Sequence, residues 1–192
     1  MTIGTEPVPK FEWDKLDQFK AEKRFLDGYP PDTRTFYAPR DKVHELLVSL
    51  LDSAQNSLVL NMYGYTDTTL DDIIRRKLKD EQVYVQMSLD SSQVGSKSTK
   101  GILKKWNNEG IGNSIAIGNS QEHAISHLKV LIVDGVYTVT GSTNWSPSGQ
   151  EKQDNQLTLS RNAVIAAEAR AVLDRNHDYM LKQMANKRIK DE

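Results

Sequence analysis

The sequence predicts an α/β fold in which a mixed β-sheet is flanked by helices on both faces. From residue 41 onward, apolar runs typical of strands alternate with segments of helical period, which favours parallel strand pairs. A hairpin pattern follows, with β-branched runs on either side of an Asp-Gly pair, and it adds antiparallel pairing. A length of 192 residues suits one domain with a substantial core rather than two.

The first 40 residues form an N-terminal arm that we predict to be partly helical. The pattern ends at Gly28 and Pro30-Pro31, which terminate helices. Before them, helical spacing is followed by Trp13, Leu16, Phe19, Lys23 and Leu26. We expect the arm to pack on the domain or across a dimer, and a regulatory or partner-binding role is the alternative. Residues 41–185 would then form the main domain, and residues 186–192 a polar C-terminal tail.

The elements of the main domain follow one another with distinct patterns. Helical periods predict helices at 43–54, 69–79, 98–108 and 163–184, the last with a stripe made of Ile165, Ala169, Val172 and Tyr179. Short apolar and β-branched runs predict strands at 57–63, 83–89, 114–117 and 156–159.

The segment HLKVLIVDGVYTVTGSTN, residues 127–144, predicts a hairpin with polar side chains at its open end. The Asp-Gly pair is typical of a two-residue turn, which would place His127 opposite Ser142. Opposed residues and residues two apart share one face of a sheet. His127, Lys129, Ser142 and Asn144 would therefore project together, which indicates a site rather than a core.

The composition describes an ordinary globular protein. Hydrophobic residues make up 38% and charged residues 27%, and the net charge of −1 neither favours nor excludes nucleic acid. The absence of cysteine excludes disulfides, thiolate catalysis and cysteine-based zinc sites. No apolar run is long enough for integral membrane association, and the start lacks a signal-peptide pattern. Cytoplasmic placement is the default expectation, with a removed leader as the alternative.

Six residues resemble the HKD motif of the phospholipase D superfamily, H-x-K-x4-D-x6-G-S-x-N: His127, Lys129, Asp134, Gly141, Ser142 and Asn144. Six fixed residues would match by chance at roughly one starting position in 10⁸. The stretches SLVLNMYGYTD, YVQMSLDSS and GSTNWSPSG are also similar to segments of that superfamily. The resemblance covers about residues 41–182 and is greatest to the small, single-motif bacterial endonuclease branch. It implies a phospholipase D-like catalytic domain at 41–185.

The resemblance implies a metal-independent phosphodiesterase that uses no cofactor. The neutral imidazole of His127 would attack phosphorus and form a phosphohistidine, which divides one difficult step into two. Lys129 and Asn144 would hold the non-bridging oxygens, and Ser142 would add a hydroxyl donor. Asp134 is explained as a turn residue, so we expect it to position the motif rather than react.

The leaving oxygen requires a second, protonated imidazole. His44, His123 and His177 lack a lysine two residues further on, so one chain supplies one motif histidine. We therefore expect a homodimer in which both copies of His127 share one active site, because an isologous interface brings the same patch of both subunits together. The two imidazoles would titrate as a coupled pair.

The second ring nitrogen of His127 needs an acceptor that fixes its orientation. Superfamily members resembling this chain carry a downstream acidic residue, often in Glu-Asn. The corresponding stretch here is QDNQ, so Asp154 is the candidate orienting residue, and by strict counting Asn155 could occupy that position.

Two further features have alternative interpretations. Lys97, Lys100 and Lys104 fall on one helical stripe that could contact nucleic-acid phosphates, or could simply be a solvated face. Trp145 follows Asn144 on the opposite strand face, which favours core packing over base stacking.

The leading functional hypothesis is an endonuclease acting on DNA, and alternatively on RNA. A lipid phosphodiesterase using the same covalent route is the second hypothesis, supported by the aromatic residues Phe11, Trp13 and Phe19 of the arm. A weakly active or inactive nucleic-acid-binding module is the third, because the orienting carboxylate is altered.

Overall fold

The computed structural model describes residues 10–191 and confirms the predicted mixed sheet. The first nine residues of the arm and Glu192 of the tail lie outside the described residues. Seven strands form one sheet in the order β1-β7-β6-β5-β2-β3-β4. They are β1 (Thr33–Ala38), β2 (Ser57–Met62), β3 (Tyr84–Asp90), β4 (Ile115–Gly118), β5 (Lys129–Val133), β6 (Tyr137–Gly141) and β7 (Asn155–Arg161). β2, β3 and β4 run parallel, whereas the remaining pairs are antiparallel.

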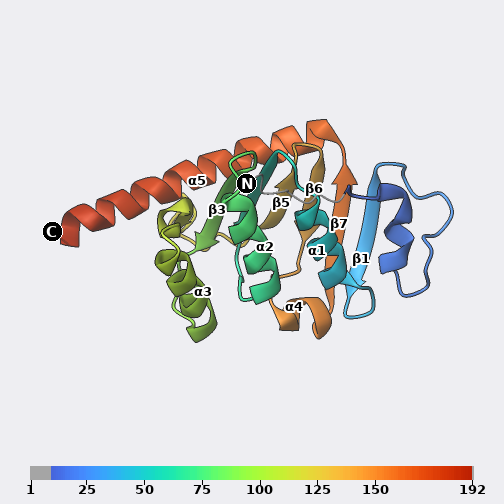
Figure 1. Cartoon of the computed structure of the whole chain (residues 1–192), viewed down its shortest axis with the longest axis horizontal. Helices are drawn as coiled ribbons and strands as arrows, with labels where there is room; N and C mark the ends of the chain where they lie inside the picture. Colours follow the sequence, from blue (N-terminus) through green and yellow to red (C-terminus); the bar gives the residue numbers. More distant parts are fainter. Residues whose placement is uncertain (1–9, 192) are drawn as a thin grey trace, which may run out of the picture.

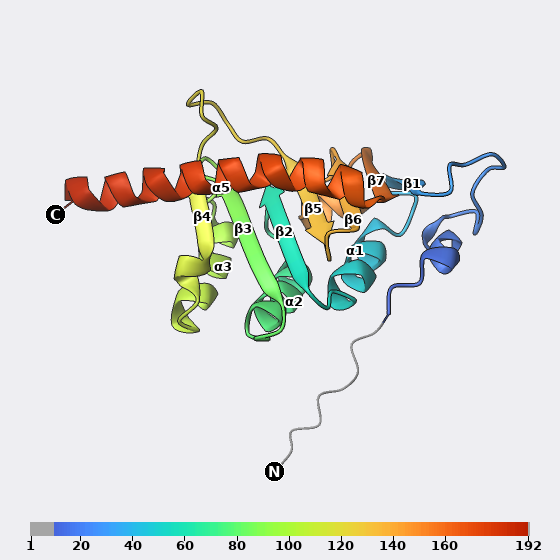
Figure 2. The same cartoon turned by 90° about the horizontal axis from the view of Figure 1, so that it is seen from above.

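Helices cover both faces of the sheet, as predicted (Figures 1 and 2). One face carries α1 (Val43–Asp52), α2 (Thr68–Leu78) and α3 (Lys97–Asn108), and the other carries the long α5 (Ala163–Asp191). The short α4 (Pro147–Glu151) follows β6, and 3-10 turns occur at η1 (Trp13–Phe19) and η2 (Gly112–Ser114). The sequence patterns located the longer helices, but α4 was missed because five residues carry too little periodicity.

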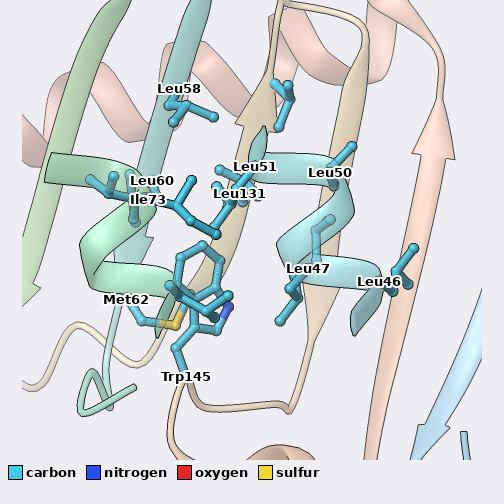
Figure 3. Packing of buried hydrophobic residues seen from close by; sticks show 14 of the residues in the cluster. Leu46, Leu47, Leu50, Leu51, Leu58, Leu60, Met62, Ile73, Leu131 and Trp145 are labelled. Atoms are coloured by element: carbon cyan, nitrogen blue, oxygen red, sulfur yellow. The ribbon is translucent and has the colours of Figure 1, made fainter. Parts of the chain in front are cut away.

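The main core lies between the sheet and α1, α2 and α3 (Figure 3). Helix α1 buries Leu46, Leu47, Leu50 and Leu51 completely, since these positions recur on one helical face. They meet side chains of β2 and β5 and the indole of Trp145, which is 1% exposed. The interpretation of Trp145 as a core residue is therefore confirmed.

Helix α5 packs through a different stripe from the predicted one. Ala166, Leu173 and Met180 are buried, whereas Ile165 is 43% and Val172 38% exposed. Apolar residues flank the contact line on both sides, so periodicity alone did not identify the buried side. The sheet face beneath α5 is also partly polar, and Gln86 of β3 donates a hydrogen bond of 2.9 Å to Asp174.

The arm is part of the folded core. The side chains of Phe11, Trp13, Leu16 and Phe19 are buried in the main cluster, so the arm packs on the domain as expected. The predicted helix through Leu26 is wrong: η1 ends at Phe19, and Leu26 is 73% exposed. The chain then forms β1, which pairs along its whole length with β7.

The two predicted boundaries do not coincide with breaks in the structure. Strand β1 lies before the boundary at residue 40 yet forms an edge of the same sheet. At the other end, α5 continues past residue 185 to Asp191. Sequence patterning missed β1 because its apolar residues were assigned to the arm.

The hairpin of β5 and β6 forms, but its register differs by one residue from the predicted one. Val133 pairs with Tyr137 rather than Val136, so Asp134, Gly135 and Val136 form the turn. The Val136 carbonyl accepts a hydrogen bond from the Asn162 backbone, which draws it out of the ladder. Asp134 is held to a neighbouring loop as well, as described below.

Candidate active site

The candidate site lies at the edge of the sheet where the parallel strands β2 and β3 end. β5 begins at this edge and β6 ends there, because both run antiparallel to their neighbours. Helices α1, α2 and α3 begin at this edge of the sheet, and α4 lies below the edge in Figure 1. Ligands of open α/β sheets commonly bind outside the carboxyl ends of the strands.

His127 and Lys129 stand at the start of β5 in contrasting environments. The His127 side chain is exposed, whereas Lys129 is only 6% exposed. The Lys129 ammonium donates a hydrogen bond of 2.9 Å to the carbonyl oxygen of His127. Burial lowers the pKa of Lys129, because a charged ammonium loses hydration inside the protein. The pair thus combines an accessible imidazole with a partly desolvated cation.

Asn144 is fixed against the residue that follows Tyr63. Its side-chain oxygen accepts a hydrogen bond of 3.2 Å from the Gly64 backbone, and Trp145 binds the Gly64 carbonyl at 2.9 Å. A side chain at Gly64 would come within 2.9 Å of the Asn144 side chain, so this close approach requires glycine. The Tyr63 ring, in turn, contacts His127, with centroids 4.5 Å apart. The Tyr63-Gly64 segment therefore joins Asn144 to His127 and Lys129.

Ser142 is separated from the regular strand by Gly141. Gly141 has a φ of 148°, and a side chain there would collide with the backbone of Gln156. Gly141 ends the regular alternation of side chains along β6. The prediction that Ser142 and Asn144 share one face with His127 assumed a continuous strand through Gly141, and the strand is not continuous there. The Ser142 hydroxyl donates to the Asn155 side-chain oxygen at 2.9 Å. The contacts of Ser142 are thus with β7 rather than with His127.

Asn155, not Asp154, is the neighbour of Ser142. The Asn155 amide accepts from Ser142 and donates to the Gly149 carbonyl at 2.9 Å, whereas Asp154 is exposed. The structure therefore places Asn155, the alternative candidate from the sequence, beside Ser142. The group in contact with the serine is a neutral amide rather than a carboxylate.

Asp134 lies at the opposite end of the hairpin, roughly 20 Å from His127 along the strand. Its carboxylate accepts hydrogen bonds from the backbones of Gln55, Asn56 and Ser57, at 3.0, 2.7 and 2.8 Å. Its φ of 53° is that of a turn residue. Asp134 thus connects the hairpin to the loop before β2.

Two further residues at this edge of the sheet, Tyr63 and Asp90, were not identified as site residues from the sequence. Tyr63 directly follows β2, and Asp90 ends β3 with 1% exposure. The Asp90 carboxylate accepts from the Ser126 backbone at 2.5 Å, immediately before His127, and from Ser92 at 2.9 Å. The sequence pattern that could have identified them is a polar residue directly at the carboxyl end of an apolar strand.

The lysine stripe of α3 is exposed at this edge. Lys97, Lys100 and Lys104 face solvent, while Thr99, Ile102 and Trp106 form the buried side of the helix. Because α3 begins at the carboxyl end of β3, its first lysines lie on the same edge of the sheet as His127.

Two of the other histidines have a ring nitrogen in contact with other side chains. Nδ1 of His44 lies 2.7 Å from Gln150 Oε1 and 3.1 Å from an Asp67 carboxylate oxygen. Nδ1 of His177 lies 2.9 Å from Ser88 Oγ beneath α5, and burial lowers the pKa of that imidazole. Within residues 10–191, no group of three or more His, Cys, Asp or Glu residues is arranged to hold a metal ion.

Comparison with known proteins identifies one family model along this chain. Residues 47–177 match the family described as "Cardiolipin synthase, PLD-like domain". A curated relative, a phospholipase D from Rickettsia bellii, is 24% identical over 167 residues, which cover 85% of this chain and 74% of the relative.

Solved structures with the same fold include two small bacterial proteins. Nuc from Salmonella typhimurium, a phospholipase D family member, aligns with a TM-score of 0.64 and 22% identity, over 77% of this chain and 94% of Nuc. NucT from Helicobacter pylori aligns with a TM-score of 0.63 and 20% identity, over 75% of this chain and 94% of NucT. A phosphatidylserine synthase from Haemophilus influenzae aligns at 0.59 and 13% identity, over 76% of this chain and 38% of that protein.

Among the helices of residues 10–191, none combines the length and apolar character needed to cross a membrane.

Proposed function

The chain belongs to the phospholipase D-like domain family, and from this membership we propose that it is a metal-independent nuclease that works as a homodimer. Phosphodiester hydrolysis is the reaction class of the family. The observation that carries the proposal is the placement of an exposed imidazole beside a buried ammonium at the carboxyl edge of the sheet. Every proposed catalytic residue falls within residues 41–185.

In the first step, a neutral His127 imidazole attacks phosphorus. A P–N bond forms while the P–O bond to the leaving group breaks, and the leaving oxygen takes a proton from a second imidazole. Lys129 and Asn144 would hold the non-bridging oxygens, with Ser142 as a further donor. The buried position of Lys129 strengthens its attraction to a phosphate, because little water screens the charge.

In the second step, water replaces the histidine. The second imidazole, now neutral, takes a proton from water as the water oxygen attacks phosphorus, and the P–N bond breaks. His127 leaves as a neutral group, and the second imidazole is protonated again. The cycle as proposed uses no metal, since the lysine ammonium compensates the charge of the phosphate and the amide donates hydrogen bonds to its oxygens.

The second imidazole would be the partner subunit's His127. Nδ1 of His44 contacts Gln150 and Asp67, and Nδ1 of His177 contacts Ser88 beneath α5. His127, in contrast, is exposed and can face a two-fold axis. One member of the pair must be neutral and the other protonated, so the rate should show a bell-shaped pH profile.

Nucleic acid is the substrate class that we favour. Helix α3 begins at the same edge of the sheet as the site, and its exposed lysines could follow the phosphates of an extended polymer. The aromatic residues that would support a lipid surface are buried: Phe11 is 7%, Trp13 5% and Phe19 8% exposed. A lipid phosphodiesterase, the activity named by the Rickettsia relative, is the second candidate.

Plasmid cleavage in excess EDTA tests the proposal directly. We expect the wild type to nick the plasmid and the folded His127→Ala dimer to be inactive. Wild-type protein that leaves DNA and RNA intact but hydrolyses phosphatidylcholine vesicles would establish the lipid alternative. Tight DNA binding without trapped phosphohistidine in a single turnover would indicate the binding module.

Mixed dimers test the shared site. If each site needs both copies of His127, random reassembly of equal amounts of wild type and His127→Ala should leave about one quarter of the wild-type rate. Independent sites would leave about one half. Dimer mass measured for both proteins and for the mixture is the control.

A further inference from the structure

Tyr63 lies beside two residues of the motif, His127 and Lys129. Its backbone N–H donates a hydrogen bond of 2.9 Å to the carbonyl of Leu128, the residue between His127 and Lys129. This bond extends the β2–β5 pairing by one step beyond Met62 and Lys129. The Tyr63 backbone is therefore fixed relative to both side chains before any side-chain contact is considered.

One aromatic ring then contacts both residues. The Tyr63 and His127 ring centroids lie 4.5 Å apart with an interplanar angle of 66°, an edge-to-face arrangement. The Lys129 ammonium lies 4.9 Å from the Tyr63 ring centroid, within the range of a cation–π interaction. The ring thus limits the orientations of the imidazole and also borders the ammonium.

The hydroxyl of Tyr63 is held as well. The side-chain amide of Gln93, in the turn after β3, donates a hydrogen bond of 2.8 Å to it. A contact at each end of the side chain, together with the backbone bond to Leu128, leaves the ring little freedom to rotate.

We infer that Tyr63 is a positioning residue of the active site, whose ring orients the His127 imidazole and keeps the Lys129 ammonium charged. The inference rests on the proposed phosphodiester chemistry at His127. Lys129 needs such support because burial favours its neutral form. The ammonium donates a hydrogen bond to the neutral carbonyl of His127, and the electron-rich face of the Tyr63 ring opposes the effect of burial.

Two substitutions separate the ring from the hydroxyl. Tyr63→Phe keeps the ring and loses the bond to Gln93, whereas Tyr63→Leu loses both and keeps an apolar side chain. We expect kcat to fall only about two- to threefold in Tyr63→Phe, and about 10- to 100-fold in Tyr63→Leu with KM less affected. Gln93→Ala should behave like Tyr63→Phe.

A measurement that does not depend on turnover separates this inference from the proposed function. The Lys129 side-chain carbon next to nitrogen can be followed by NMR in 13C-lysine-labelled protein, and assigned by its absence in Lys129→Met. We expect its titration midpoint in Tyr63→Leu to lie about one pH unit below that in Tyr63→Phe. Equal midpoints in folded variants would overturn the inference even if the wild type cleaves DNA.

Equal loss of activity in Tyr63→Phe and Tyr63→Leu would also overturn it, because the hydroxyl would then act on the substrate directly. If the wild type cleaves no phosphodiester but the midpoints differ as expected, the proposed function fails while the assignment of Tyr63 stands.

Discussion

The two ends of the β5–β6 hairpin carry the same motif but do different work. At the open end, His127 is exposed and Lys129 is buried, with no carboxylate of residues 10–191 paired to its ammonium, an arrangement that suits phosphate binding. At the turn, the Asp134 carboxylate is satisfied by three backbone N–H groups of a neighbouring loop. We therefore expect the residues of this motif to divide into those that take part in the reaction and those that stabilise the fold.

The largest expected effect is at the open end, from His127→Ala. Loss of the attacking group should lower the rate by about 10⁴-fold or more, as when other covalent nucleophiles are removed. Because the side chain is exposed, the free energy of unfolding should change by less than about 0.5 kcal/mol. Single-turnover cleavage and thermal unfolding of the same preparation measure both quantities. A large loss of stability would show that His127 also serves the fold.

Lys129→Met should separate activity from stability at the same end. We expect about 10²- to 10³-fold slower cleavage, because a donor to the developing charge is lost. Stability should hold or increase, since the lowered pKa of Lys129 means that folding disfavours its charged form.

The same pKa shift sets a pH dependence. Between the lowered folded pKa and the ordinary lysine value of about 10.4, the unfolded chain binds more protons, so the contribution of Lys129 to stability rises with pH in that window. Denaturant unfolding across this range, with Lys129→Met as the control, tests the sign; a contribution that falls with pH would contradict it.

At the open end of the hairpin, the sequence predicted which residues form the motif but not how the two strands pair. The residues of the motif and the α/β class followed from spacing and periodicity, which are local properties. The register did not, because the Val136 carbonyl binds Asn162 and the Asp134 carboxylate binds residues 55–57, both distant in sequence. Tyr63 was missed for the same reason: its role depends on pairing between β2 and β5, which no local pattern reports.

At the turn, Asp134→Ala should reverse the pattern seen at the open end. Three backbone donors lose their acceptor, and alanine must adopt a φ of 53°, so we expect a loss of about 2–3 kcal/mol in stability. The rate of the folded fraction should stay within about threefold of wild type, because the site lies at the other end of the hairpin. Asp134→Asn, which keeps one acceptor and tolerates positive φ, is the matched control and should lose less stability. Urea unfolding with kinetics measured well below the midpoint tests this, and a rate loss as large as that of Lys129→Met would show that the ends are coupled.

The smallest expected effects come from alanine substitutions at Asn155 and Asp154, beside the open end. Asn155 accepts from the Ser142 hydroxyl and donates to the Gly149 carbonyl, so Asn155→Ala frees the serine and leaves a carbonyl without its partner. We expect cleavage to slow about five- to tenfold, with a loss of about 1 kcal/mol in stability. Asp154→Ala should stay within about twofold of wild type, because its side chain is exposed. Should Asp154→Ala prove the slower of the two, the carboxylate would be the orienting group, and the site would depend on a rearrangement of this loop when substrate or the second subunit binds.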